Sequence, residues 1–124
     1  MWSVEYAYIV SWLDEQDNET VASIFAALEH LEQHGPTLGR PLVDTLTGTE
    51  AKNLKELHPA TPGKTEVRIL FAFDPNRQAI MLFAGDKSKG KSGKIKWSGW
   101  YKDAIPKAEK LYREHVKKLG GNNG

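Results

Sequence analysis

The strongest chemical signature in the chain is the stretch "GDKSKGKS", Gly85 to Ser92, which follows the apolar run "AIMLFA". It matches the pattern G-x-x-x-x-G-K-[S/T], in which backbone amides and a lysine hold the phosphates of a nucleotide. A true phosphate loop lies between a parallel strand and the N-terminus of a helix. The pattern therefore predicts a nucleotide hydrolase only if the neighbouring segments form that strand and that helix.

The segments around this loop argue against that setting. "TEVRILFAF" and "QAIMLFAG" have strand character and are joined by only "DPNR". So short a connection permits an antiparallel hairpin, because a parallel crossover needs about a dozen residues. The segment after Ser92, "GKIKWSGWYK", has two more glycines and no apolar helical period, and no later strand offers an aspartate for magnesium. A nucleotide hydrolase remains a remote alternative.

The same region is better suited to a nucleic-acid backbone. Lysines neutralise phosphates, and aromatic faces such as those of Trp100 and Tyr101 can stack on bases. The alternative is a solvated surface loop that Trp97 or Trp100 anchors to the core. Five lysines fall within ten residues: Lys87, Lys89, Lys91, Lys94 and Lys96.

The distribution of charge supports a polyanion as partner. Residues 1–50 carry one basic and nine acidic residues, a net charge of −8, whereas residues 51–124 carry sixteen basic and seven acidic residues, a net charge of +9. Such a division predicts one face for nucleic acid or the ribosome and another that avoids it. Two solvated faces of opposite charge are the alternative.

Length and composition limit the remaining classes. A chain of 124 residues suits one domain, and the absence of cysteine excludes disulfides and thiolate metal sites. No apolar stretch approaches the roughly 20 residues that span a bilayer. The N-terminus has early acids and no basic segment, so we expect no signal peptide and a cytoplasmic protein without membrane contact.

The periodicity predicts a strand at "WSVEYAYI", a turn or short helix at "SWLDEQDNE", and an amphipathic helix over "ETVASIFAALEHLEQHG". Asp17 or Asn18 can cap this helix, and Gly35-Pro36 ends it. A connector rich in Gly, Pro and Thr then leads to a first strand at "KNLKELH", ahead of the hairpin.

The last predicted element is a helix that begins near Pro106, with Asp103 as its cap. The whole pattern predicts a small α+β domain over residues 1–119, with an N-terminal strand and helices packed on an antiparallel sheet and a C-terminal helix. Residues 120–124, "GGNNG", are expected to form a flexible tail.

In order and spacing, "KNLKELHPATPGKTEVRILFAFDPNRQAIMLFAGDKS" and "WYKDAIPKAEKLYREHV" resemble the RelE/HigB superfamily of bacterial type II toxins, and most closely its phage-derived HigB-like branch. "WLDEQ…LEHLEQHGPTLGRPLVDTL" resembles the N-terminal half of that branch, so the likeness covers nearly the whole chain. The resemblance implies a RelE-like fold and ribosome-dependent cleavage of mRNA. The mRNA's 2′-hydroxyl attacks the adjacent phosphate, and neither a metal nor a cofactor is required.

The resemblance also implies site residues. Arg68 matches the strand arginine that contacts the scissile phosphate, although it could instead form a strand-face salt bridge to Glu66. Lys55 matches a basic position before the loop, His58 could act as base or acid, and Lys87 lies where the family places active residues. Tyr101 is a proton-handling or stacking aromatic residue, or else it packs the helix onto the sheet. The residues expected to bind RNA are Lys64, Asp86, Lys89, Lys91, Lys94, Lys96 and Trp100.

The implied partners are a cognate antitoxin, often of the helix-turn-helix type in this family, the ribosome with its mRNA, and operator DNA only through the antitoxin. The chain departs from the family at "GDKSKGKSGKIKW", which holds no arginine for a bidentate phosphate contact. Related toxins inhibit DNA gyrase, so a non-catalytic inhibitor of gyrase or of another nucleic-acid machine is the alternative function.

Overall fold

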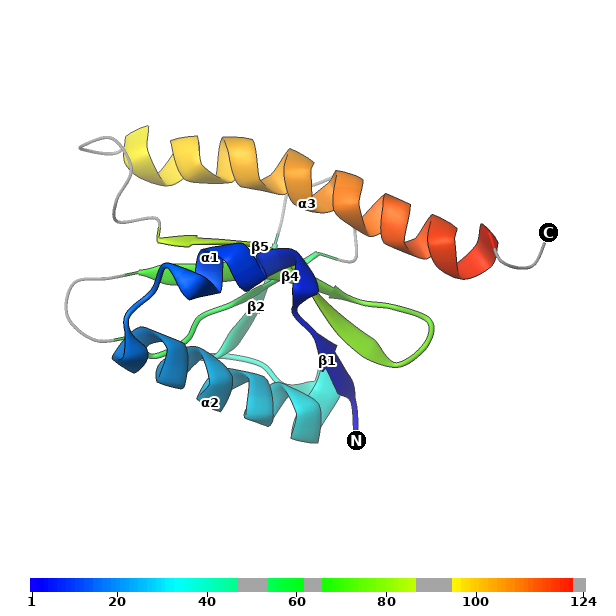
Figure 1. Ribbon diagram of the computed structural model, residues 1–124, viewed down its shortest axis with the longest axis horizontal. Helices are drawn as coiled ribbons and strands as arrows, with labels where there is room; N and C mark the ends of the chain where they lie inside the picture. The colour runs from blue at the N-terminus through cyan, green and yellow to red at the C-terminus, as the bar shows by residue number, and fades with distance from the viewer. Residues whose placement is uncertain (47–53, 62–65, 87–94, 122–124) are drawn as a thin grey trace.

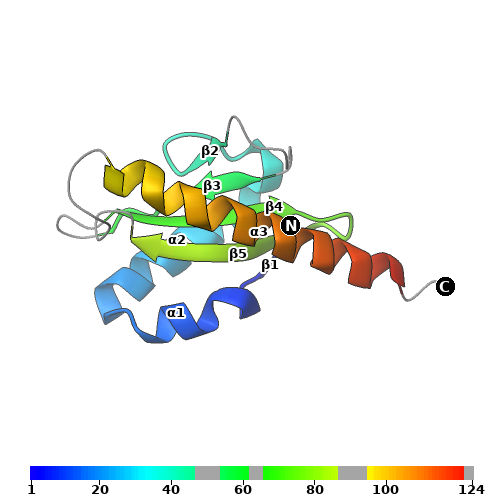
Figure 2. The same ribbon diagram turned by 90° about the horizontal axis from the view of Figure 1, so that it is seen from above.

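A computed structural model describes residues 1–46, 54–61, 66–86 and 95–121, with the side chains of 95–98 and 121 left out (Figure 1). The chain forms three layers, in which a five-stranded sheet separates two N-terminal helices from one long C-terminal helix (Figures 1 and 2). The helices are α1 (Val10–Asp14), α2 (Asn18–His34) and α3 (Ile95–Gly121), with 3-10 turns η1 (Ala7–Ile9) and η2 (Gly35–Thr37). The strands are β1 (Ser3–Glu5), β2 (Val43–Thr45), β3 (Lys55–Leu57), β4 (Val67–Phe73) and β5 (Gln78–Asp86). The α+β class is confirmed.

The sheet has the order β1-β5-β4-β3-β2. Strands β2 to β5 pair antiparallel, and the predicted β4–β5 hairpin is confirmed. The edge strand β1 instead pairs parallel to β5, over Ser3–Gln78 to Glu5–Ile80, so the sheet is mixed. Strand β2 lies within the segment that the sequence indicated only as a connector. It consists of three residues, too few to show a period.

Local signals explain helix α2. The Asp17 side chain caps it by accepting a hydrogen bond from the Thr20 N–H at 2.7 Å, as the sequence predicted. The helix ends at His34, and Gly35 follows with a φ of 55°. A Cβ at Gly35 would also overlap the Trp2 indole, so both the backbone and the packing require glycine here.

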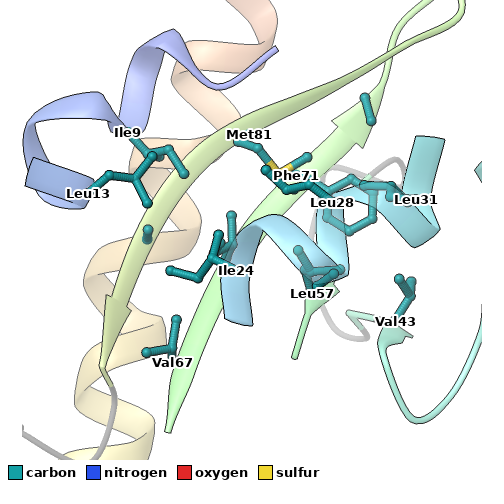
Figure 3. Packing of buried hydrophobic residues seen from close by; sticks show 14 residues of the cluster. Ile9, Leu13, Ile24, Leu28, Leu31, Val43, Leu57, Val67, Phe71 and Met81 are labelled. Carbon is teal, nitrogen blue, oxygen red and sulfur yellow. The ribbon is translucent and has the colours of Figure 1, made fainter. Parts of the chain in front are cut away.

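Each face of the sheet has its own apolar core. Ile24, Leu28 and Leu31 of α2 pack against Phe71 and Met81 (Figure 3). On the opposite face the buried contacts of α3 include two small residues, Ala104 and Ala108, which pack against a cluster formed by Leu54, Leu70, Ala72, Ile80 and Leu82. Small side chains let a helix lie close to a sheet, so the N-terminal half of α3 is held directly over the strands.

Helix α3 begins at Ile95, well before the predicted start near Pro106, and that prediction is wrong. Pro106 lies inside the helix and Asp103 is a helical residue, not a cap. The helix continues because Trp100, Ala104 and Ala108, spaced four residues apart, all face the sheet. Pro106 is on the exposed side, where the loss of one backbone hydrogen bond is offset by this packing.

The fold also bears on the phosphate-loop pattern. A helix does follow the loop closely, contrary to the expectation, while residues 87–94 lie outside the described part of the chain. Strand β1 is the parallel neighbour of β5 and pairs only with Gln78–Ile80, the first residues of β5. It does not pair with Asp86 at the carboxyl end of β5. The neighbouring strand at that end is antiparallel β4.

Within the described residues, no helix combines the length and apolar character of a membrane span.

Candidate functional site

Four polar side chains gather on the face of the sheet that α3 covers. Glu56 lies on β3 opposite Leu70, which belongs to the α3-side core, and Arg68 lies two residues before Leu70 on β4. Continuing the β3–β4 register by one residue places His58 opposite Arg68. Tyr101 reaches the same place from α3. The group of Glu56, His58, Arg68 and Tyr101 is called the polar cluster below.

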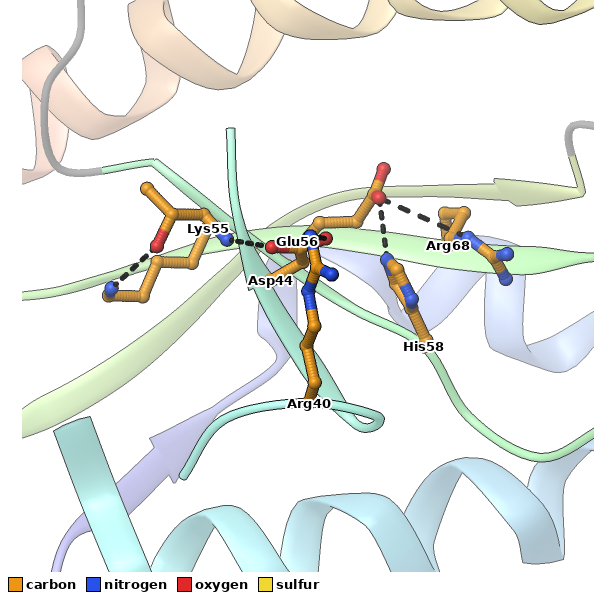
Figure 4. Close-up of polar contacts among 7 residues, drawn as sticks. Arg40, Asp44, Lys55, Glu56, His58 and Arg68 are labelled. Carbon is orange, nitrogen blue, oxygen red and sulfur yellow. Dashed lines mark hydrogen bonds and ion pairs between the residues drawn. The ribbon is translucent and has the colours of Figure 1, made fainter. Parts of the chain in front are cut away.

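Glu56 is the centre of the polar cluster (Figure 4). Its residue exposure is only 5%, and its Oε1 accepts a hydrogen bond from Nε2 of His58 at 2.6 Å. The same oxygen lies 4.0 Å from Nε of Arg68. A buried carboxylate is costly unless it is paired with cations and hydrogen-bond donors. His58 and Arg68 therefore hold Glu56 in place, and Glu56 in turn fixes their orientation.

Tyr101, on α3, is the fourth member of the polar cluster. Burial raises the pKa of its phenol well above the usual range, and a hydrogen bond and the negative charge of Glu56 raise it further. The positive charge of Arg68 acts in the opposite direction but is the smaller influence. The phenol therefore stays protonated at neutral pH.

Arg68 is held by its own backbone as well as by Glu56. Its Nη1 donates a hydrogen bond to the Val67 carbonyl oxygen at 2.8 Å, and its side chain is 17% exposed. The ion pair with Glu56 replaces the one with Glu66 that the sequence offered as the alternative. A guanidinium fixed in this way presents a permanent positive charge at a set position, which is what a phosphate or a developing anionic transition state requires.

Aromatic side chains border the cluster at the start of α3. The Trp100 indole packs on Gly85, the β5 residue that pairs with Arg68, so closely that a Cβ at Gly85 would overlap it. The same ring lies 5.0 Å from the Tyr101 ring and 5.9 Å from the Phe83 ring, between centroids. Trp100 therefore fixes the position of the helical turn that carries Tyr101.

Two further predicted residues are not members of the cluster. Lys55 is on β3 between Leu54 and Glu56, and therefore points to the opposite face of the sheet, where its Nζ lies 3.4 Å from Oγ1 of Thr45. Asp86 ends β5, and its Oδ1 accepts a hydrogen bond from the Glu66 N–H at 3.0 Å. Asp86 thus contributes to pairing between the ends of β4 and β5.

Most of the lysines that are expected to bind RNA lie outside the described residues. Lys64, Lys87, Lys89, Lys91 and Lys94 lie outside the described residues, and Lys96 is in the first turn of α3 with its side chain not described. The residues on either side of the loop are described. Asp86 ends the strand that holds Gly85, and α3 brings Trp100 back to Gly85. Gly85, just before the loop, and Trp100, near the start of α3, therefore both lie beside Arg68 of the polar cluster.

The sequence indicated three of the four members of the cluster, Arg68, His58 and Tyr101, but not Glu56. A signal for it was present in "LKELH", where Leu54 and Glu56 alternate with Lys55 and Leu57. Leu54 and Leu57 are both buried, on opposite faces of the sheet, and Glu56 shares the face of Leu54. Glu56 is therefore an acid on an otherwise apolar side of a strand.

Among the described residues, no three His, Asp or Glu side chains come together as a metal site.

Comparison with known proteins identifies relatives. Residues 11–113 match the family model described as phage derived protein Gp49-like. HigB2 of Mycobacterium tuberculosis, named as a toxin, is 49% identical over 115 residues, which is 93% of this chain and 54% of HigB2. HigB3 of the same organism, also named as a toxin, is 45% identical over 98 residues, which is 79% of this chain and 78% of HigB3. The chain thus spans about half the length of HigB2 and more than three quarters of HigB3.

Proposed function

The chain belongs to the Gp49-like family of phage-derived proteins, and from this premise we propose that it is the toxin of a toxin–antitoxin system. Support comes from its similarity to HigB2 and HigB3, both named as toxins. We further propose that it cleaves mRNA on the ribosome in the cytoplasm, and that a cognate antitoxin of the helix-turn-helix type neutralises it. The observation that carries the chemistry is the polar cluster, because it combines an acid–base pair, a fixed cation and a protonated phenol.

The proposed reaction is an internal transfer within the RNA. The 2′-hydroxyl oxygen forms a bond to the adjacent phosphorus, and the bond from phosphorus to the 5′ oxygen of the next nucleotide breaks. The products are a 2′,3′-cyclic phosphate and a 5′-hydroxyl. The step needs a base for the 2′-hydroxyl proton, positive charge for the phosphorane and an acid for the leaving oxygen.

His58 is the proposed base. Its side chain is 24% exposed, against 6% for Glu56 and 17% for Arg68, so it is the member of this ion-paired group that an RNA reaches first. Its Nε2 is committed to Glu56, and the other ring nitrogen, Nδ1, accepts the proton. The Glu56 carboxylate then stabilises the imidazolium, as a carboxylate does in other histidine–acid pairs.

Arg68 is the proposed stabiliser of the phosphorane, because its guanidinium is a permanent charge fixed beside His58 and Glu56. Lys87, Lys89, Lys91, Lys94 and Lys96 are proposed to neutralise the flanking phosphates, with Trp100 as a stacking surface. Lys64 is proposed to contact the RNA backbone, and Asp86 would support the strand end from which the loop leaves. Lys55 points to the opposite face of the sheet, so it is not part of the proposed catalytic group.

Tyr101 is the proposed acid. Its raised pKa keeps the phenol protonated until a strongly basic oxygen such as the leaving 5′ alkoxide forms beside it. After the step His58 holds an extra proton and Tyr101 lacks one. Glu56 contacts both groups, so the Nε2 proton of His58 can pass through Glu56 to Tyr101, which restores the charge of both residues. Exchange with water at the 24% exposed His58 side chain then removes the proton from Nδ1 and returns one to Nε2, which restores the starting tautomer.

Primer extension on mRNA incubated with ribosomes and purified protein tests this function. We expect discrete cleavage sites with the wild-type chain and with Arg113→Ala, a matched control because Arg113 is 70% exposed and lies on the outer side of α3. Arg68→Ala should lose at least about 100-fold in cleavage rate, while circular dichroism remains native-like. If the folded Arg68→Ala protein cleaves normally, the site assignment is wrong. Growth arrest without mRNA cleavage but with inhibited gyrase would favour the alternative target.

A further inference from the structure

A second surface, on the opposite side of the sheet from the polar cluster, has the form of a binding groove. It lies where the edge strand β1 meets α2, and it encloses about 190 Å³. Its apolar floor belongs to the α2-side core, whereas Arg68 and Glu56 lie on the α3 side. The residues that line it are Val4, Tyr6, Phe25, Leu28, Glu29 and Glu32.

The floor of the groove is both apolar and accessible. Tyr6 is 37% exposed and packs edge-on against Phe25 with ring centroids 5.2 Å apart. Val4 and Leu28 of the α2-side core complete the floor. An exposed aromatic ring above apolar side chains is typical of a protein-binding surface.

The rim of the groove is acidic. Glu29 and Glu32 lie one turn apart on α2, and the Glu32 backbone carbonyl also accepts a hydrogen bond from the Trp2 N–H at 2.9 Å, which joins the helix to the strand. Residues 1–46 contain eight acidic residues and one basic residue, Arg40, so the wider surface is strongly negative. RNA is excluded from such a surface by charge, and a cationic partner is favoured.

From this geometry we infer that the β1–α2 groove binds a protein segment that combines apolar side chains with lysine or arginine. The apolar side chains fill the floor beside Tyr6 and Phe25, and the basic side chains pair with Glu29 and Glu32. Strand β1 is at the edge of the sheet, so an extended segment could also pair with it. This assignment rests on the proposed toxin function, under which the segment belongs to the antitoxin.

Titration of the isotope-labelled full chain with two synthetic peptides tests the groove by NMR. One peptide alternates Leu and Lys, and the other alternates Leu and Glu. We expect the Leu-Lys peptide to shift the amide signals of Val4, Tyr6, Phe25 and Leu28, and the Leu-Glu peptide to leave them unchanged. Equal binding of both peptides, or shifts confined to the polar cluster, would overturn the inference.

Two double variants separate the groove from general charge. Glu29→Lys with Glu32→Lys should weaken the Leu-Lys peptide by about tenfold or more. Asp14→Lys with Glu15→Lys makes the same change in net charge at exposed residues of α1 and its end, outside the groove. This control pair should bind the peptide nearly as well as the wild type. A loss that is the same in both pairs would contradict a specific site.

Neutralisation in cells links the groove to the proposed function while keeping the two distinguishable. The probe is the product of the adjoining gene, co-expressed with the chain. The Glu29→Lys, Glu32→Lys variant should arrest growth like the wild type but resist rescue by that product. A wild type that never arrests growth contradicts the toxin proposal, and the peptide titration still decides the groove. A variant that is toxic and fully rescued contradicts the groove as antitoxin site.

Discussion

His115 and Asp74 join helix α3 to the turn between β4 and β5. The imidazole Nε2 lies 2.9 Å from the Asp74 Oδ2, across 41 positions of the chain. The Asp74 side chain is fully buried, and its other oxygen accepts hydrogen bonds from the backbone N–H groups of Asn76 and Gln78, each at 2.9 Å. One carboxylate therefore shapes the hairpin turn and fastens the C-terminal half of α3 to it.

Asp74→Ala is expected to lower the free energy of unfolding by about 2–4 kcal/mol, because three donors in partly buried hydrogen bonds lose their acceptor at about 1 kcal/mol each. His115→Ala removes only one of these contacts and should cost about 1 kcal/mol. Urea denaturation followed by circular dichroism measures both. Asp103→Ala, at an exposed position on the same helix, is the control and should change stability by less than about 0.5 kcal/mol. Equal stability of Asp74→Ala and the control would show that the contact contributes nothing.

Gly85→Ala is expected to destabilise the protein by about 1–3 kcal/mol and to change tryptophan fluorescence, because its Cβ would overlap the Trp100 indole. Gly99→Ala is the matched control, since a Cβ there meets no atom within 4 Å and alanine favours a helix. In combination with Trp100→Ala, the Gly85→Ala change should become nearly neutral. An additive double variant would mean that Trp100 does not pack on this glycine in solution.

The pKa of Tyr101 predicts a loss of stability in alkali. Burial and Glu56 raise the phenol pKa in the folded state above its ordinary value of 10.0, so its contribution to stability is fully present below pH 10 and declines as the pH rises above that value. Urea denaturation from neutral pH to above pH 10 should therefore show a steeper decline for the wild type than for Tyr101→Phe. Tyr112 is also raised, by burial and Asp74, so Tyr112→Phe should remove a separate part of the decline. Parallel curves for wild type and Tyr101→Phe would contradict the burial of this phenol.

Much of the fold was predictable because local signals determine it. The Asp17 cap, the apolar period of α2 and the short Asp74–Arg77 connection each specify their element within a few residues. The parallel pairing of β1 depends on which strand lies beside β5, and that is a tertiary outcome. The sequence did not predict the early start of α3, because the glycines and lysines of this segment interrupt its apolar periodicity. The residues that face the sheet there, which include Trp100 and Ala104, are therefore not recognisable as a helical stripe.

The candidate site was only partly predictable for a related reason. Arg68, His58 and Tyr101 could be selected by type and by resemblance, but the residue that connects them could not be identified that way. Glu56 becomes central because it is buried between an arginine, a histidine and a phenol, which depends on the register of β3 with β4 and on the placement of α3. The position of Lys55 follows from the same register, which turns adjacent residues to opposite faces.

Glu56→Gln is the sharpest test of how the polar cluster works. Glutamine keeps the size of the side chain but cannot accept a proton from His58 or return one to Tyr101, so mRNA cleavage should fall by about 100-fold or more. Glu56→Ala should also cost about 2 kcal/mol or more in stability, because it leaves Arg68 without its ion-pair partner. The double variant Glu56→Ala with Arg68→Ala should recover part of that stability but none of the activity. Cleavage by primer extension and urea denaturation on the same preparations separate the two effects. If Glu56→Gln cleaves mRNA at the wild-type rate, Glu56 is a structural acid, and the base and acid must be sought among other residues.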